Sequence, residues 1–265
     1  TTLVLQWLAQ RRMPVAWFAV DETDSEPDRF LSYVVAAVRT VVPEFGSDIE
    51  RLLSAPQLPP PEILADAVVN ELAALEQPLL IVLDDYHRHT SKTVHEIMTR
   101  VLQYLPQQLH VLLLTRRDPP LPLGLWSSRQ WLVELRAADL RFTRQETQAF
   151  FEKRLRKRLS DHTVELLDGR TEGWVAALQL VQLSLSPAED PGQLVGRYAD
   201  CDRSIAEYLM DEVVSRQPSE VIDFLTITAI LERFCAPLCD YLLPEHKAAP
   251  DTRTIISRIE KENLF

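Results

Sequence analysis

Glycine is scarce in this chain, which has six glycines among 265 residues. That is well below the usual share of about 7%. The six glycines form no cluster of the kind that cradles a phosphate group. Any nucleotide site formed by these residues is therefore expected to be incomplete.

Cysteine is also rare, and its pattern excludes a disulfide-built domain. The three cysteines are odd in number and late in the chain: Cys201, Cys235 and Cys239. A metal site of Cys235, Cys239 and His246 is conceivable, but no C-x-x-C pair supports it, so we interpret the cysteines as structural. The pattern fits a reducing cytoplasm, and no 18-residue apolar run suggests a membrane span. We predict a cytoplasmic protein with no membrane partner.

An excess of positive charge is missing as well. The net charge is −11, which argues against this segment itself gripping DNA or an anionic membrane. With 46% hydrophobic and 25% charged residues, the composition is that of ordinary globular domains.

The most informative feature is an apolar run that ends in two acids. Residues 79–83 are all apolar, and Asp84 and Asp85 follow directly. Such a run predicts a strand buried on both faces of a parallel sheet, and ligands of these sheets bind at the carboxyl ends of the strands. The pattern has the form of a Walker B motif, in which an acid helps to hold a phosphate-bound metal ion. The alternative is a strand that simply ends in a turn-forming Asp.

The first residues suggest the other half of such a site. Thr1 and Thr2 precede Leu3, Val4, Trp7 and Leu8, which share one face at helical spacing. A helix that begins at a Thr pair resembles the helix after a P-loop, G-x-x-x-x-G-K-[ST], whose hydroxyl ligates Mg²⁺. On this interpretation Thr1 is that residue, and the glycine-rich loop with its Lys lies upstream. The alternative is an ordinary Thr N-cap.

Strands and helices alternate in the first half of the sequence. We predict strands at 15–20, 79–84, 109–114 and 131–135, and helices at 30–42, 62–75 and 91–105. This alternation is typical of a parallel α/β sheet. From Thr143 onward only helices are predicted, beginning with a capping box of Thr143 and Glu146. The later helices are expected at 161–167, 174–183, 204–214, 219–231 and 252–263, with a linker at 186–196.

Several motifs in this order resemble one family, the MalT-type transcriptional activators. These are ATP-binding LuxR-family regulators of the STAND class of P-loop ATPases. The motifs are Thr1-Thr2-Leu3, Trp17–Asp21, Leu83–His87, Leu114–Arg116, Phe142–Glu146, Gly173–Leu180 and Tyr208–Val213.

The resemblance implies an α/β fold with a P-loop NTPase parallel sheet, followed by a small helical domain and a partial winged-helix domain. The expected boundaries are 1–142 for the NTPase domain, which lacks its first strand and P-loop, 143–200 for the helical domain, and 201–265 for the winged helix. In such regulators, bound ADP stabilises a closed, monomeric form of the protein. ATP and a small-molecule inducer favour a form that self-associates and activates transcription. DNA is bound through a helix-turn-helix outside this segment.

The resemblance also implies a role for each matching residue. Thr1 and Asp84 would hold Mg²⁺. Asp85 would polarise the attacking water or sense the γ-phosphate, and Arg116 would be the sensor arginine. Thr1, Thr2, Asp84, Gly173 and Trp174 would contact ATP or ADP, although Val175 replaces the Pro of the family's G-x-P motif.

Other functions stay open at this point. The chain could be a P-loop ATPase with fast turnover, or a STAND ATPase module attached to another effector. It could also be a nucleotide-free scaffold for protein interactions, which the few glycines and Val175 allow. We expect at most weak ATPase activity.

Overall fold

The computed structural model describes residues 1–155, 158–183, 217–231, 234–242 and 251–261. The chain divides into two compact units, Thr1–Arg129 with Arg258–Phe265, and Gln130–Ser257. The predicted domain boundaries after residues 142 and 200 stay predictions. Each unit is described by itself.

A three-stranded parallel sheet forms the centre of the first unit. Its strands are β1 (Val15–Ala19), β2 (Leu79–Asp84) and β3 (Leu109–Leu113), in the order β1-β2-β3. All six residues of β2 are buried, as expected for a central strand with helices on its faces. The first three predicted strands are therefore confirmed.

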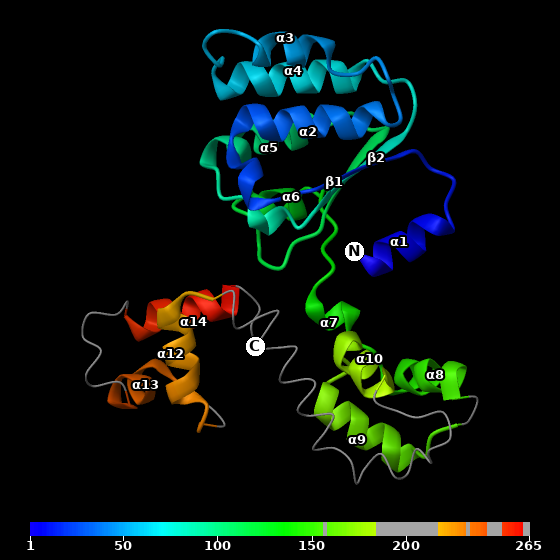
Figure 1. Ribbon diagram of the computed structural model, residues 1–265, viewed down its shortest axis with the longest axis vertical. Coiled ribbons are helices and arrows are strands. Elements are labelled where there is room, and N and C mark those ends of the chain that lie inside the picture. Colours follow the sequence, from blue (N-terminus) through cyan, green and yellow to red (C-terminus); the bar gives the residue numbers. More distant parts are fainter. Residues whose placement is uncertain (156–157, 184–216, 232–233, 243–250, 262–265) are drawn as a thin grey trace. The chain divides into compact units, whose positions relative to one another are not determined.

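Helices between the strands build the core of this unit (Figure 1). They are α2 (Pro27–Arg39), α3 (Ser47–Leu53), α4 (Pro61–Ala73) and α5 (Lys92–Gln103). Helix α2 packs on β1, α4 packs on α5, and α3 contacts both α2 and α4. The buried residues of α2 include Phe30, Val34 and Val38, which recur at helical spacing as the sequence predicted.

Four shorter elements complete the first unit. They are α1 (Thr2–Ala9), the 3-10 turns η1 (Glu22–Ser25) and η2 (Tyr86–Arg88), and α6 (Leu123–Ser128). Helix α1 forms where the Thr pair predicted a helix, but it contains no buried residue. Its apolar side chains Leu3, Leu5 and Trp7 are exposed.

The predicted fourth strand is wrong. Residues 131–135 are not part of a strand, and three of their apolar side chains are exposed: Trp131, Val133 and Leu135. Alternating apolar residues suit a strand, but a strand forms only where a neighbouring strand takes up its backbone hydrogen bonds. In the described part of the chain, no strand pairs with this segment.

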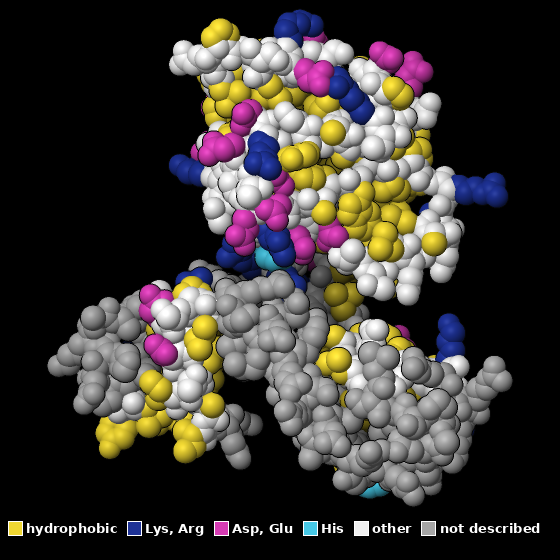
Figure 2. Space-filling view, in the orientation of Figure 1, with side chains coloured by type: hydrophobic (Ala, Val, Ile, Leu, Met, Phe, Trp, Pro, Cys, Tyr) yellow, Lys and Arg dark blue, Asp and Glu magenta, His cyan; other side chains and the backbone are white. Residues whose placement is uncertain are grey.

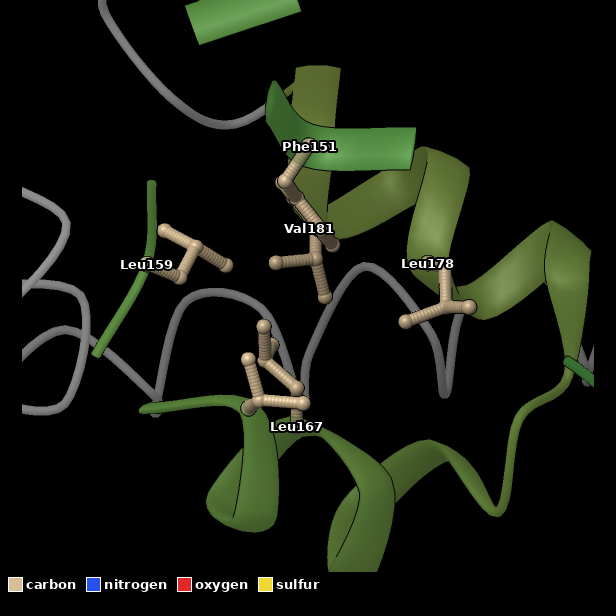
Figure 3. Close-up of a cluster of buried hydrophobic side chains, with 6 residues drawn as sticks. Phe151, Leu159, Leu167, Leu178 and Val181 are labelled. Atoms are coloured by element: carbon tan, nitrogen blue, oxygen red, sulfur yellow. The ribbon is translucent and has the colours of Figure 1, made fainter. Parts of the chain in front are cut away.

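Helices alone make up the described part of the second unit. The first four are α7 (Ala137–Leu140), α8 (Arg144–Leu155), α9 (Asp161–Thr171) and α10 (Val175–Leu183). The predicted capping box is present: the Glu146 carboxylate accepts from the Thr143 N–H at 2.9 Å, and the Thr143 hydroxyl accepts from the Glu146 N–H at 3.2 Å. Figure 3 shows the core that α8, α9 and α10 share with the segment before α9, built from Phe151, Leu159, Val164, Leu167, Leu178 and Val181.

Three more helices follow, α12 (Ser219–Thr228), α13 (Ala236–Leu242) and α14 (Thr252–Lys261). They match the predictions near 219–231 and 252–263. The end of α14, from Arg258 onward, is assigned to the first unit. Cys239 is buried and Cys235 is exposed; neither forms a disulfide, and no metal-binding group of three or more residues occurs in the described ranges. The predicted linker at 186–196, the helix at 204–214, Cys201 and His246 lie outside the described residues. None of the described helices is long and apolar enough to cross a membrane.

Candidate functional site

The candidate site is built on the carboxyl edge of the sheet. Backbone hydrogen bonds also join the chain segments that directly follow the strands. The Val20 N–H donates to the Asp84 carbonyl (2.8 Å), the Leu114 N–H to the Leu83 carbonyl (2.9 Å), and the Tyr86 N–H to the Leu114 carbonyl (3.0 Å). The loops that carry Asp85 and Arg116 are therefore held side by side at one edge.

Thr1 and Asp84 meet at this edge, although 83 positions separate them in sequence. The Thr1 hydroxyl oxygen lies 3.0 Å from each carboxylate oxygen of Asp84. Asp84 is buried, and its Oδ1 also accepts from the Asp85 N–H at 3.1 Å. Hydroxyl and carboxylate oxygens are hard donors that suit Mg²⁺, so these two side chains fit the predicted metal. The neighbouring Thr2 is the exposed first residue of α1.

Asp85 adopts a left-handed backbone conformation, with φ 55° and ψ 34°. Asp tolerates this region better than most residues, and the conformation turns the chain sharply at the end of β2. The Asp85 carboxylate stays half-exposed and faces Arg88, with 3.7 Å between Oδ2 and Nε. It is thus accessible to a ligand at the sheet edge.

Arg88 also joins the ends of two strands, a role that the sequence did not reveal. Besides Asp85, it contacts Asp21 after β1, with 3.5 Å between Nη1 and Oδ2. The pKa of the Asp21 carboxyl is lowered, chiefly by the backbone N–H and the side chain of Thr23 and further by Arg88. No signal in the sequence marks Arg88, because its partners are brought to it only by the fold. Figure 2 shows acidic and basic side chains close together on this part of the first unit.

Arg116 lies in the loop after β3 and is exposed. Arg116 and Asp85 share one neighbour, His87. Burial is the main cause that lowers the pKa of His87; Asp85 acts against it, and Arg116, Arg117 and Arg88 add to it. Asp85 and Arg116 are therefore both within electrostatic range of one imidazole.

His87 itself sits in the 3-10 turn η2, as a turn residue should. Its Nδ1 is buried and has no hydrogen-bond partner among the described residues. Its backbone carbonyl accepts from Arg117 Nη2 at 2.9 Å instead. The contact that fixes this turn is therefore a backbone one.

Gly173 and Trp174 belong to the second unit, so the structure does not relate them to Asp84. Gly173 has φ +72°, and a Cβ on it would lie 2.3 Å from the Phe142 carbonyl oxygen. The Phe142 N–H donates to the Gly173 carbonyl at 2.8 Å. The glycine thus allows two backbone segments to approach closely, while Trp174 is half-buried before α10. Their contact with nucleotide stays a prediction.

The fold has a counterpart among solved structures. A parallel sheet with helices between its strands binds ligands at its carboxyl edge, where this chain places two acids. A solved Walker-type ATPase from Pyrococcus abyssi matches with a TM-score of 0.58 and 14% identity, over 99% of this chain and 81% of that one. The predicted α/β P-loop NTPase fold is confirmed.

The sequence relatives are more specific. Residues 210–265 match the model of the MalT winged helix domain, which confirms the predicted winged-helix part. Two curated relatives named HTH-type transcriptional regulator MalT, from Yersinia enterocolitica and Serratia proteamaculans, are each 32% identical over 267 aligned residues and all of this chain. The chain is homologous to MalT-type transcriptional regulators along its whole length, as its motifs predicted. It spans 29% of the length of these relatives.

Proposed function

We propose that this chain is the ATP- or ADP-binding switch region of a MalT-like transcriptional activator. The pairing of the Thr1 hydroxyl with both oxygens of Asp84 carries the proposal. Two oxygen donors from distant parts of the sequence converge at the sheet edge where a nucleotide phosphate and its metal bind in this fold. The relationship to MalT regulators supports the role in transcription.

Thr1 and Asp84 would hold Mg²⁺, Thr1 through its hydroxyl and Asp84 through its carboxylate or a bridging water. The bound metal would neutralise charge on the phosphates. A phosphate-binding loop ahead of Thr1 would complete the site, because the glycines of this chain form no such loop. Thr2, at the start of α1, would contact the same phosphates through its hydroxyl or backbone.

Asp85 and Arg116 would distinguish ATP from ADP. The half-exposed Asp85 carboxylate would orient the attacking water, and the exposed Arg116 guanidinium would contact the γ-phosphate. A ligand biases a two-state protein only through contacts that differ between the states, and the γ-phosphate offers contacts that ADP lacks. Slow hydrolysis would reset the switch, so ATPase activity would be weak.

The remaining parts of the proposal concern the whole protein. Gly173 and Trp174 would approach the nucleotide from the helical domain at 143–200, with the NTPase domain at 1–142 and the winged helix at 201–265. ATP and a small-molecule inducer would favour self-association in the cytoplasm. Because this chain carries a net charge of −11, DNA would be bound by a separate helix-turn-helix domain.

Nucleotide binding by a form of the protein that includes the phosphate-binding loop tests the proposal. We expect tight binding of ATP and ADP that requires Mg²⁺. Asp84→Ala should weaken the binding of both nucleotides at least tenfold, because it removes a metal ligand. Arg116→Ala should weaken ATP more than ADP, because only ATP carries the γ-phosphate.

Matched controls are available for both variants. Asp28→Ala and Arg12→Ala remove an exposed acid and an exposed base outside the site and should leave both affinities unchanged. Absence of nucleotide binding in the unmodified protein would refute the switch and favour a nucleotide-free scaffold. Turnover near 1–100 s⁻¹, the range of typical enzymes, would favour a working ATPase instead.

A further inference from the structure

A cluster of buried rings lies directly beside the loop that carries Asp84 and Asp85. The rings of His89 and His95 pack against each other, with centroids 4.4 Å apart and planes tilted by 33°. Tyr86 meets His89 edge-on at 4.6 Å, and its hydroxyl lies 3.1 Å from Nδ1 of His95. The ring of Phe30 in α2 packs against His89, with 5.4 Å between the ring centroids. The cluster thus joins the loop after β2 to helices α2 and α5.

His89 is the unusual member of this cluster. Its side chain is only 2% exposed, and neither ring nitrogen has a hydrogen-bond partner among the described residues. A buried polar group without a partner is costly, and a buried charge without one costs more. The ring is therefore tolerated only as neutral imidazole.

The electrostatic surroundings of His89 also favour its neutral form. Burial lowers the pKa of His89 to about 4, with His95 adding to the effect. The pKa of His95 is lowered by burial and by Arg117. The other titratable neighbour, Tyr86, is neutral, since burial raises its pKa, and Phe30 from α2 is apolar. These groups offer no compensation for a proton on His89.

We infer that the packed pair His89–His95 is a pH-sensitive latch on the loop that carries Asp84 and Asp85. When the solution becomes acidic, His89 takes up a proton from solvent and leaves the apolar site, and residues 86–90 open with it. Tyr86 follows Asp85 directly and is anchored to both His95 and the Leu114 carbonyl, so the opening disturbs the metal-binding edge. This last consequence rests on the proposed nucleotide site, whereas the latch does not.

Hydrogen exchange of the protein without nucleotide tests the latch. A pKa that is 6.5 in the open loop and about 4 in the closed loop predicts about tenfold more opening at pH 5.5 than at pH 7.5. We therefore expect the amides of residues 86–90 to lose about tenfold in protection, after correction for the intrinsic exchange rate. The amides of α4, which is remote in sequence from the loop, should not change. Unchanged protection of residues 86–90 would overturn the inference.

Substitutions of His89 test whether this residue causes the pH dependence of hydrogen exchange. Leu has no titrating group and suits an apolar site, so His89→Leu should remove most of the pH dependence at residues 86–90. The smaller remainder comes from His87 and His95, whose pKa values are also lowered. His110→Gln removes an exposed histidine and should leave the dependence as it is. A dependence in His89→Leu as large as that in the unmodified protein would refute the role of His89. If His89→Leu does not fold, His89→Phe gives the same test, since Phe likewise has no titrating group and suits an apolar site.

Binding of Mg²⁺-ADP adds a separate readout. The unmodified protein should lose more affinity between pH 7.5 and 5.5 than His89→Leu does. If no nucleotide binds at either pH, the proposed function fails, but the exchange experiment still decides on the latch. If nucleotide binds equally in both proteins at both pH values while the exchange rates differ, the latch acts on the loop alone, and its connection to the site is refuted.

Discussion

Arg117 donates a hydrogen bond from Nη2 to the backbone carbonyl of His87, over 2.9 Å, and so ties the loop after β3 to the loop after β2. The Thr115 hydroxyl in turn donates to the Arg117 carbonyl at 2.6 Å. One loop offers Arg116 and the other offers Asp85. The relative position of the two candidate catalytic residues is therefore set by Arg117 as well as by the sheet.

Arg117→Ala should loosen both loops. The variant removes a charge-assisted hydrogen bond at a half-buried carbonyl, so the free energy of unfolding should fall by about 1 kcal/mol. ATP affinity should fall more than the stability loss suggests, because Asp85 and Arg116 lose their fixed separation. Urea unfolding and nucleotide titration measure the two effects. Arg12→Ala serves as the control, and an equal change in both variants would contradict the explanation.

Glu71 is expected to be a structural acid rather than a functional one. Its carboxylate accepts from the backbone N–H groups of Gly46, Asp48 and Ile49 at the start of α3, the last two at 2.8 and 3.2 Å. Glu71→Ala leaves these donors without their partner and should cost about 1–3 kcal/mol. Glu71→Gln keeps one acceptor oxygen and should cost less.

Thermal unfolding of the two Glu71 variants compares their losses of stability. Glu76→Ala, which removes an exposed acid close by in the sequence, should be neutral. A loss of nucleotide binding in Glu71→Gln without a loss of stability would show that the residue belongs to the site after all.

Gly173 permits a close backbone contact, and its replacement tests that packing role. In Gly173→Ala the new Cβ would meet the Phe142 carbonyl oxygen at 2.3 Å while φ stays at +72°. Because the obstacle is backbone, the clash cannot be relieved by a rotamer change. We expect a loss of about 2–4 kcal/mol in the helical unit.

The matched control for Gly173→Ala is Gly169→Ala, at a helical position where a Cβ meets nothing within 4 Å. This control should be neutral or stabilising by up to about 1 kcal/mol, since Ala favours helices. Urea unfolding of both variants measures the difference in their free energies of unfolding. If Gly173→Ala is as stable as Gly169→Ala, the close approach to Phe142 contributes nothing to stability.

Stability should depend on pH between 7.5 and 5.5. The pKa values of His87, His89 and His95 are all lowered in the folded protein. The folded state therefore binds fewer protons than the unfolded state once the pH falls below about 6.5, and stability declines. For His89 alone the tenfold change in opening corresponds to about 1.4 kcal/mol at pH 5.5.

Carboxylates do not account for a loss in this range of pH. The lowered pKa values of Asp21, Glu50 and Asp66 concern groups that are charged in both states above pH 5, so their contribution is lost only at lower pH. Urea unfolding at several pH values should thus show a decline that begins near pH 6.5. A decline that begins only below pH 4.5 would show that the histidines do not couple to folding.

The sequence predicted the sheet well but not the contacts around it. Apolar runs marked β1, β2 and β3, because a fully buried strand must be apolar along its whole length. The meeting of Thr1 and Asp84 followed from the family's motifs and from the rule that ligands bind at the carboxyl ends of parallel strands. The prediction of a strand at 131–135 was wrong, because an alternation of apolar and polar residues fits a strand but does not provide a partner strand.

The burial of His89 could not be predicted in the same way. A histidine in a loop after a strand has no periodicity to place it, and its site is made by Tyr86, His95 and Phe30 from three different elements. Arg88 is a similar case, because Asp21 and Asp85 become neighbours only through the pairing of β1 with β2. Local patterns identify elements, whereas such residues acquire their surroundings from the completed fold.

Tyr86 is expected to set the geometry of the loop through its hydroxyl. The side chain is fully buried, and the hydroxyl is the hydrogen-bond partner of His95 Nδ1. Tyr86→Phe keeps the ring but leaves the imidazole nitrogen without a partner, so stability should fall by about 1–3 kcal/mol. Tyr241→Phe removes a hydroxyl from a side chain that is 82% exposed and should change stability little. Thermal unfolding of the two variants at pH 7.5 measures this difference. Equal stability would mean that the hydrogen bond is not needed to hold the turn, and the anchor of the Asp84–Asp85 loop would then be the ring packing alone.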